Sequence, residues 1–242
     1  MIRKVMLVFS LMAGSVLAQG QFREFQVGDR TIEARVLNVD ATRGEVELEL
    51  RNNQRKKVKS SIFSKKDQSY ILDCAKVKMF QSQRFKIEVE KNVLDKRKET
   101  VGSQKGVLRN TESICYDINI NNNTGITIDG VTIAYNVFYE QEGVGQGKND
   151  TRRLFVDGTL KIELLAPRQK VSVQTATFEI YNQRLTGGYD AYVGGAPSHQ
   201  SGKSKGVWLK IHLRTPSGLS ATREVCLPKN TNELFAWQKS KK

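Results

Sequence analysis

Histidine is the side chain best suited to proton transfer near neutral pH, and this chain has two, His199 and His212. A nucleophilic site would need one of them beside a serine or cysteine and an orienting acid. His212 alternates with the apolar Ile211 and Leu213, so we expect it on the solvent side of a strand. Neither a Gly-x-Ser-x-Gly turn nor metal-ligand spacing accompanies the histidines. The sequence therefore predicts a protein that is not an enzyme and has no cofactor or metal.

Aromatic side chains in a long polar loop are a second candidate for chemistry, in this case ligand binding. The segment 182–206 contains several glycines and follows Tyr181 directly. Long loops in compact domains are often functional, and rings beside a sheet edge can stack on a sugar or clamp a peptide. The candidate ligand-binding loop comprises Tyr181, Tyr189, Tyr192, His199 and the outward-facing Trp208. The alternative is a mobile loop whose tyrosines pack locally.

Positive charge is concentrated between residues 74 and 111, where ten Lys and Arg residues accompany four acidic ones, a surplus of six. The whole chain has a formal net charge of +14. One interpretation is a solvated loop, and the other is a contact strip for an anionic envelope polymer or lipid headgroups. The candidate basic strip consists of Lys91, Lys96, Arg97, Lys98, Lys105 and Arg109.

Three cysteines, Cys74, Cys115 and Cys226, are an odd number, so at least one thiol has no partner within the chain. Cys115 and Cys226 lie in strand-like segments near the two ends of the C-terminal region. They are the candidate disulfide pair if the protein is exported to an oxidising compartment.

Strands of alternating polarity must position these residues, and the first group lies near the N-terminus. Val46, Leu48 and Leu50 alternate with charged residues, which indicates a strand with one buried face. Asn52-Asn53 suits a tight turn, with the chain returning through residues 56–59. Ser64, followed three residues later by Asp67, suits the start of a short helix. A small barrel closed by a helical turn is the expected result.

The same stretch resembles the homology domain of the Sla-type endocytic adaptors. The resemblance covers residues 22–73, about a fifth of the chain, and is carried by Phe22–Phe25, Ile32–Ala34, Val46–Leu48, Val58 and Phe63–Ile71. It implies an SH3-like fold that binds a peptide or protein, as the eukaryotic module binds short sorting motifs. Similar modules occur in exported bacterial proteins. The resemblance assigns no pocket residue in this chain.

The sequence predicts a second, larger domain at residues 84–229. Seven alternating strands separated by turns indicate an antiparallel, immunoglobulin-like β-sandwich, and the clearest apolar stripe runs from Val131 to Tyr139. Residues 74–83 are expected to be a hinge-like linker, and residues 91–111 a charged insertion. Residues 230–242 form a basic tail that either docks or frays.

Met1–Ala18 is expected to be a signal peptide, since Arg3 and Lys4 precede a short apolar run and small residues precede the cleavage position. Its removal leaves a charge of 14 − 2 = +12 and no transmembrane segment. Export argues against nucleic acid as the partner. We therefore expect an exported protein, periplasmic, envelope-associated or secreted, that acts as a protein-binding or scaffold protein. The alternative is binding of a cell-envelope polysaccharide or anionic polymer.

Overall fold

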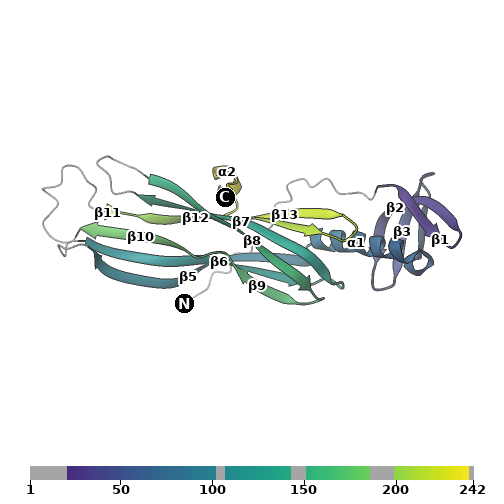
Figure 1. Ribbon diagram of the computed structural model, residues 1–242, viewed down its shortest axis with the longest axis horizontal. Helices are drawn as coiled ribbons and strands as arrows, with labels where there is room; N and C mark the ends of the chain where they lie inside the picture. Colours follow the sequence, from purple (N-terminus) through teal and green to yellow (C-terminus); the bar gives the residue numbers. More distant parts are fainter. Residues whose placement is uncertain (1–20, 102–106, 143–150, 186–198, 240–242) are drawn as a thin grey trace.

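The computed structural model describes residues 21–101, 107–142, 151–185 and 199–239. They form three antiparallel sheets, and one long helix joins the small sheet at one end of the molecule to the two larger ones (Figure 1). The all-β class predicted from the sequence is confirmed. The expected signal peptide, Lys105, Tyr189 and Tyr192 lie outside the described residues.

The small sheet contains β1 (Arg23–Val27), β2 (Arg30–Asp40), β3 (Glu45–Leu50) and β4 (Arg55–Lys59). The strands pair in chain order through successive antiparallel hairpins. The sheet does not close into the barrel expected from the sequence. Its edge strands β1 and β4 share no ladder among the described residues, and a single bridge joins Val27 to Phe63 after β4 and the short 3₁₀ helix η1 (Ser60–Ile62).

Local sequence explains the hairpin between β3 and β4. Asn53 has a φ of 61°, in the left-handed region that asparagine tolerates, and Leu50 N donates to Gln54 O at 2.9 Å. The predicted turn is therefore confirmed. The alternation in β3 is confirmed too, because Val46 and Leu48 are buried in the core of the small sheet.

Helix α1 (Lys65–Gln81) begins at the predicted cap. Ser64 Oγ accepts a hydrogen bond from Asp67 N at 3.2 Å and donates one to Asp67 Oδ2 at 2.7 Å. The buried Asp67 carboxylate also accepts from Arg23 at 2.7 Å and from Gln26 N at 3.0 Å. The cap thus fixes the start of the helix against β1.

The helix is longer than the sequence indicated, because residues 74–81 continue it through most of the expected hinge. Its apolar side chains face two different cores in succession. Tyr70, Ile71 and Cys74 pack against the small sheet, whereas Val77, Met79 and Phe80 belong to the larger core. An apolar side that changes direction along the helix leaves no single stripe, so the periodicity that identifies a helix is weak.

Polar contacts fix the second half of α1 to the larger unit. Asp73, 4% exposed, accepts from Ser217 N at 3.0 Å and from Ser217 Oγ at 2.6 Å. Arg223 Nη1 donates to Phe80 O at 3.0 Å and to Phe85 O at 2.5 Å. The two carbonyls lie at the helix end and the start of the next strand, so the arginine binds the connection where a hinge was expected.

The larger unit consists of two facing sheets and is sandwich-like. One sheet has the order β11-β10-β6-β5, with β9 also paired to β6. Its strands are β5 (Phe85–Val101), β6 (Val107–Asn122), β9 (Lys170–Gln174), β10 (Phe178–Leu185) and β11 (His199–Gln200). The other sheet has the order β13-β12-β7-β8. Its strands are β7 (Ile128–Glu142), β8 (Thr151–Leu165), β12 (Gly202–Arg214) and β13 (Ser220–Leu227).

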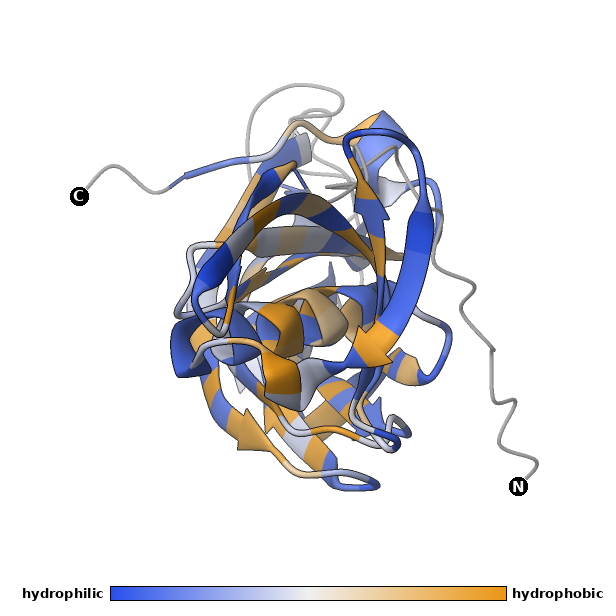
Figure 2. Ribbon diagram, turned by 90° about the vertical axis from the view of Figure 1, so that its right-hand side faces the viewer, coloured by the Kyte–Doolittle hydropathy of each residue, from blue (hydrophilic) through white to orange (hydrophobic). Residues whose placement is uncertain are grey.

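Apolar side chains with a period of two fill the space between these sheets. In β7, the residues from Val131 to Val137 that were predicted to form a stripe are buried at every second position, and Tyr139 packs against them. Figure 2 shows the alternation of hydrophobic and hydrophilic residues along the strands. The pattern explains how a chain with many charges forms a continuous core.

The expected charged insertion is instead a long hairpin of β5 and β6. Residues 91–101 continue β5, and their partners in β6 run from Val107 to Tyr116. Cross-strand ion pairs such as Lys96–Glu112, at 2.8 Å, accompany the ladder. Charged residues on both faces conceal a strand from an analysis based on apolar alternation.

The C-terminal segment docks on the larger unit rather than fraying over its described residues. Helix α2 (Thr231–Leu234) follows β13, and the Phe235 ring then stacks on Phe138 of β7 with centroids 4.6 Å apart. Figure 1 shows α2 on the outer side of the sheet that contains β7 and β12.

Candidate functional site

An apolar groove of about 240 Å³ lies on the small sheet, near the turns of its two outer hairpins. The groove is lined by Val27, Arg30, Ile32, Leu48, Leu50, Lys56, Val58, Ile62 and Phe63. These residues come from all four strands, from η1 and from Phe63 directly after it. They meet where the sheet fails to close between β1 and β4.

The floor of the groove follows from the same alternation that builds the core. Leu48 and Phe63 are almost fully buried, and Val58 packs beside them while remaining partly accessible. Helix α1 covers another part of this apolar side through Tyr70 and Ile71. The part near the hairpin turns has no such cover, and Ile62 at its rim is 44% exposed. The groove is therefore the accessible end of the small core.

Two cations flank this apolar floor. Arg30 and Lys56 are exposed, and neither has an ion-pair partner among the described residues. By contrast, two other cations of the small sheet are paired within the chain: Arg35 lies 2.8 Å from Glu49, and Lys57 lies 2.8 Å from Glu45. The groove thus combines apolar contact area with positive charge available to a carboxylate.

A second hollow, of about 320 Å³, is lined mainly by charged side chains of β3 and β4. One of its acids, Glu45, is paired with two lysines of β4. Hydrogen bonds from Lys57 and Lys59 hold the pKa of Glu45 down at about 2. A hollow with balanced charges and little apolar lining gives weaker support for ligand binding than the groove does.

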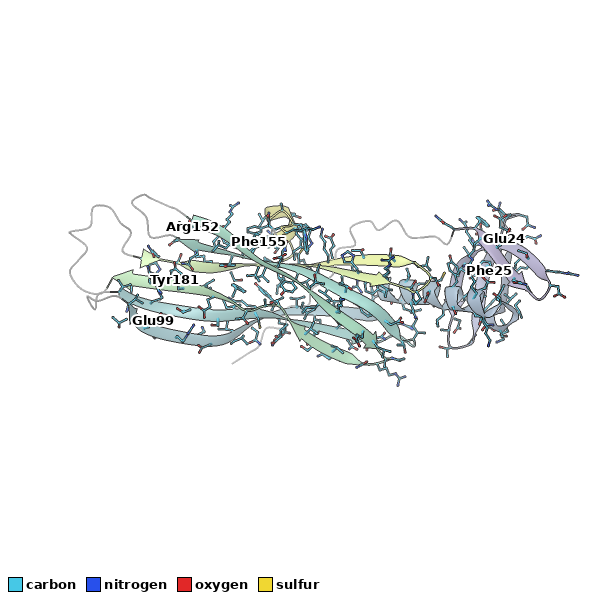
Figure 3. All side chains as sticks on the ribbon, in the orientation of Figure 1. Glu24, Phe25, Glu99, Arg152, Phe155 and Tyr181 are labelled. Carbon is cyan, nitrogen blue, oxygen red and sulfur yellow. The ribbon has the colours of Figure 1, made fainter. Side chains whose placement is uncertain are left out.

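The candidate ligand-binding loop is not assembled into one site by its described members. Tyr181 follows the core residue Ile180 and points outward from its sheet, and the Arg109 guanidinium lies 4.9 Å from the Tyr181 ring centroid. Trp208 belongs to the opposite sheet and donates from its indole N–H to Glu224 at 3.0 Å. Figure 3 shows Tyr181 at the end of the larger unit remote from the small sheet.

His199 pairs with Arg184 at the edge strand β11 and is exposed. His212 faces solvent, as predicted, with Nδ1 2.9 Å from Thr222 Oγ1. The two histidines belong to different sheets. Among the contacts of the described residues, neither histidine lies beside a serine or cysteine, and the Thr222 hydroxyl beside His212 is not accompanied by an orienting carboxylate.

The candidate basic strip is partly neutralised within the β5–β6 hairpin. Arg97 lies 3.3 Å from Asp95 and 2.5 Å from Glu179, and Arg109 lies 4.0 Å from Glu99. Lys91 and Lys98 are exposed on β5. A strand that carries both positive and negative charges attracts a polyanion less strongly than the surplus of Lys and Arg in the sequence suggested.

The candidate disulfide between Cys115 and Cys226 is absent, since all three cysteines are free thiols. Cys115 is out of phase with the core residues Ile114 and Tyr116, and Cys226 is out of phase with Val225. The two thiols therefore point outward from opposite sheets. Facing sheets pack about 10 Å apart, which exceeds the reach of a disulfide between their outer faces.

The thiols lack the signature of reactive nucleophiles. Burial raises the pKa of Cys74 to about 11, and it also raises the pKa values of Cys115 and Cys226. A thiol becomes a strong nucleophile when its pKa falls toward neutrality, which is the opposite direction. The described residues contain no group of three metal-ligating side chains, and no described helix has the length and apolarity to cross a bilayer.

Comparisons with known proteins leave the family of this chain open. No protein-family model matches it, and no curated protein is similar to it. A solved structure described as Northeast Structural Genomics Consortium target SoR45 aligns with 66% of this chain and 96% of its own, at 9% identity and a TM-score of 0.27. A similarity at that level supports no conclusion about fold or function.

The groove was not predicted from the sequence. A usable signal was present, because Ile62 and Val58 are apolar residues beside the cation Lys56 and outside any clear strand or helix stripe. What the sequence could not supply is the approach of Val27 and Ile32 from the first hairpin. That proximity depends on the register of all four strands.

Proposed function

We propose that this chain is an exported, non-catalytic protein-binding or scaffold protein whose small N-terminal sheet is an SH3-like module that holds a short peptide in the apolar groove. The observation that carries the proposal is the groove itself, an accessible apolar floor between Arg30 and Lys56. The resemblance of residues 22–73 to peptide-binding adaptor modules supports the same function. The proposal that the protein is exported rests on residues 1–18, whose sequence is similar to a signal peptide.

The size of the groove defines what a ligand must supply. At about 240 Å³, it is smaller than the pockets of roughly 300–1,000 Å³ that enclose drug-sized molecules, so one or two side chains fit. Burying one leucine-sized side chain contributes about 1.5–3 kcal/mol, whereas an exposed ion pair contributes about 0.2–1 kcal/mol. The apolar residue of the peptide thus provides most of the affinity, and a nearby carboxylate orients it.

The larger unit has a positioning role in this proposal, with an immunoglobulin-like sandwich carrying the module at one end. The protonated thiols and the separated histidines favour a non-catalytic role. Binding of an envelope polysaccharide or anionic polymer has less support, because Tyr181 and Trp208 face outward from different sheets and Arg97 is paired with acids.

A display selection tests this function with a matched pair of variants. A random peptide library is selected on the chain without residues 1–18, and the enriched peptides are titrated against Ile62→Glu and Leu72→Glu. Ile62 and Leu72 are 44% and 43% exposed, but only Ile62 lines the groove. We expect peptides with an apolar and an acidic residue, and an affinity at least tenfold lower, about 1.4 kcal/mol, for Ile62→Glu alone.

Two outcomes would count against the function. A selection that enriches no peptide would remove the support for a peptide ligand. Peptides that bind equally to both variants would lie elsewhere on the molecule, and the groove would have no role in their recognition.

A further inference from the structure

The outward face of the sheet β13-β12-β7-β8 carries aromatic side chains where solvent-facing residues are usually polar. On β7, Asn136 and Phe138 are out of phase with the core residue Val137 and point outward. The register places Trp208 of β12 opposite Asn136, and Phe155 of β8 opposite Phe138. We call Asn136, Phe138, Phe155, Trp208 and Lys210 the aromatic face.

Two rings of the C-terminal segment contact this face. Phe235 is stacked on Phe138, with an interplanar angle of 15°. Trp237 meets Trp208 edge to face, with ring centroids 5.2 Å apart. Lys210 Nζ lies 4.7 Å from the Trp208 centroid and 4.6 Å from the Trp237 centroid, so one ammonium group contacts both indoles.

A main-chain hydrogen bond adds polar recognition to these contacts. Gln238 N donates to Asn136 Oδ1 at 2.7 Å, and the Asn136 amide nitrogen donates to Tyr135 O at 3.1 Å. Asn136 is 0% exposed in the complete chain. The buried Asn136 side chain is thus hydrogen-bonded on both its oxygen and its nitrogen, and the bond from Gln238 fixes the segment just beyond the two rings.

The start of the segment is fixed more firmly than the part on the aromatic face. Thr231 is fully buried and donates from Oγ1 to Pro228 O at 2.7 Å. A Cβ atom at Gly206 would lie 2.7 Å from Thr231 Oγ1, which shows how closely the start of α2 packs on β12. Beyond it, Phe235 and Trp237 are only partly buried. Segments with few buried contacts open at lower free-energy cost than the core does.

We propose that the aromatic face is an exchangeable docking site for an extended segment with two aromatic residues two positions apart, and that residues 235–238 of the chain occupy it in cis. Attachment to the same chain supplies an effective concentration of order millimolar. The segment therefore covers the site in the complete chain even if the same peptide in trans binds only at micromolar concentration. The C-terminal segment acts as a strap that keeps this face closed to other molecules.

The test supplies the segment in trans. A chain that ends at Leu234 keeps α2 and Thr231 but lacks the strap. A fluorescent peptide of residues 234–242 is titrated into this truncated chain and into the complete chain, with anisotropy as the readout. We expect saturable binding to the truncated chain and at least tenfold weaker binding to the complete chain. A peptide with alanine at the two aromatic positions should not bind.

A second variant opens the site without shortening the chain. The double substitution Phe235→Ala and Trp237→Ala should also bind the wild-type peptide, whereas Leu234→Ala should stay closed because Leu234 is 60% exposed. Equal binding to the complete and truncated chains, or no binding to a truncated chain that melts cooperatively, would overturn the proposal. Unfolding of both opened variants would also overturn it, because the segment would then be an integral part of the fold.

Discussion

The small sheet and the aromatic face of the larger unit both carry apolar side chains outside a core, but the chain treats the two surfaces differently. On the larger unit, Phe235 and Trp237 of the same chain cover Phe138 and Trp208. On the small sheet, helix α1 covers only part of the apolar side and leaves the groove around Ile62 accessible. The proposed peptide would cover the apolar floor of the groove as the C-terminal segment covers the aromatic face.

The two surfaces also differ in how they depend on the rest of the molecule. The groove belongs to a core of its own, centred on Phe25, Leu48 and Ile71. The aromatic face lies on the outer side of a sheet whose inner side belongs to the larger core. If the two cores are independent, damage to one should leave the function of the other intact.

The largest expected effect comes from Ile71→Ala. Ile71 is 2% exposed and attaches α1 to the small sheet. Removing a buried side chain of this size costs about 2–5 kcal/mol, which is a large fraction of the stability of a unit this small. We expect the small sheet to unfold at a lower temperature than the larger unit, with loss of peptide binding at the groove. A calorimetric scan should resolve two transitions.

The contact between the strap and the aromatic face should be the same in Ile71→Ala as in the wild type. Quenching of tryptophan fluorescence reports on it, because both tryptophans of the chain, Trp208 and Trp237, lie at the aromatic face. An Ile71→Ala chain that loses both units in one transition would contradict the division into two cores.

A smaller effect is expected at the joint between the units. Asp73→Ala removes the acceptor of two hydrogen bonds from Ser217 and leaves Lys76, 3.4 Å from Asp73 in the wild type, with Asp129 as its acidic neighbour. Loss of a buried acceptor typically costs about 1–3 kcal/mol. We expect the melting transitions of the two units to move apart in temperature. The distribution of distances between a label on β2 and a label on β7 should broaden, whereas the affinity for peptide should not change.

Lys78→Ala is the matched control for the joint, since Lys78 lies on the same helix but bonds to Asn38 at an exposed position. It should change neither the transitions nor the label distance. A label distance that stays narrow in Asp73→Ala would mean that the apolar contacts of Phe80 alone hold the joint.

Local physics made part of this fold predictable. The Asn53 turn and the Ser64 cap each depend on residues within four positions, and the buried side of β3 depends only on alternation. The length of α1 was missed because its apolar side passes from Ile71 on one core to Phe80 on another. A helix that packs against two cores in succession has no single hydrophobic period in its sequence.

The binding surfaces were harder to predict for a related reason. The groove requires Val27 and Ile62, which are 35 positions apart by residue number, to approach each other through the register of four strands. The aromatic face requires Phe235 to reach Phe138 across the sheet. Aromatic residues in a polar tail, such as Phe235 and Trp237, were the one local sign that the tail would dock. By contrast, the tyrosine loop was chosen for its composition, and its described members do not converge.

The smallest expected effect distinguishes the charged side of the small sheet from its apolar groove. Hydrogen bonds from Lys57 and Lys59 lower the pKa of Glu45 from 4.5 to about 2. Because the folded value is the lower one, Glu45 adds stability above pH 4.5, and this contribution disappears as the pH falls toward 2. The Glu45 side chain is partly exposed and both lysines that contact it are exposed, so solvent screening keeps the contribution small. Glu45→Gln should therefore lower the melting temperature slightly at pH 7 and not at pH 2, and 1 M salt should reduce the difference.

Peptide binding at the groove should not change in Glu45→Gln, because Glu45 alternates with the buried Val46 and points away from the apolar side that Leu48 shares with the groove. A gap in melting temperature that widens as the pH falls would show that Glu45 is not held in its charged form by the two lysines. A loss of peptide affinity would mean that the ligand reaches around β3 to the charged hollow. The two faces of the small sheet would then form one site, and the distinction between an apolar recognition surface and a self-neutralised one would have to be abandoned.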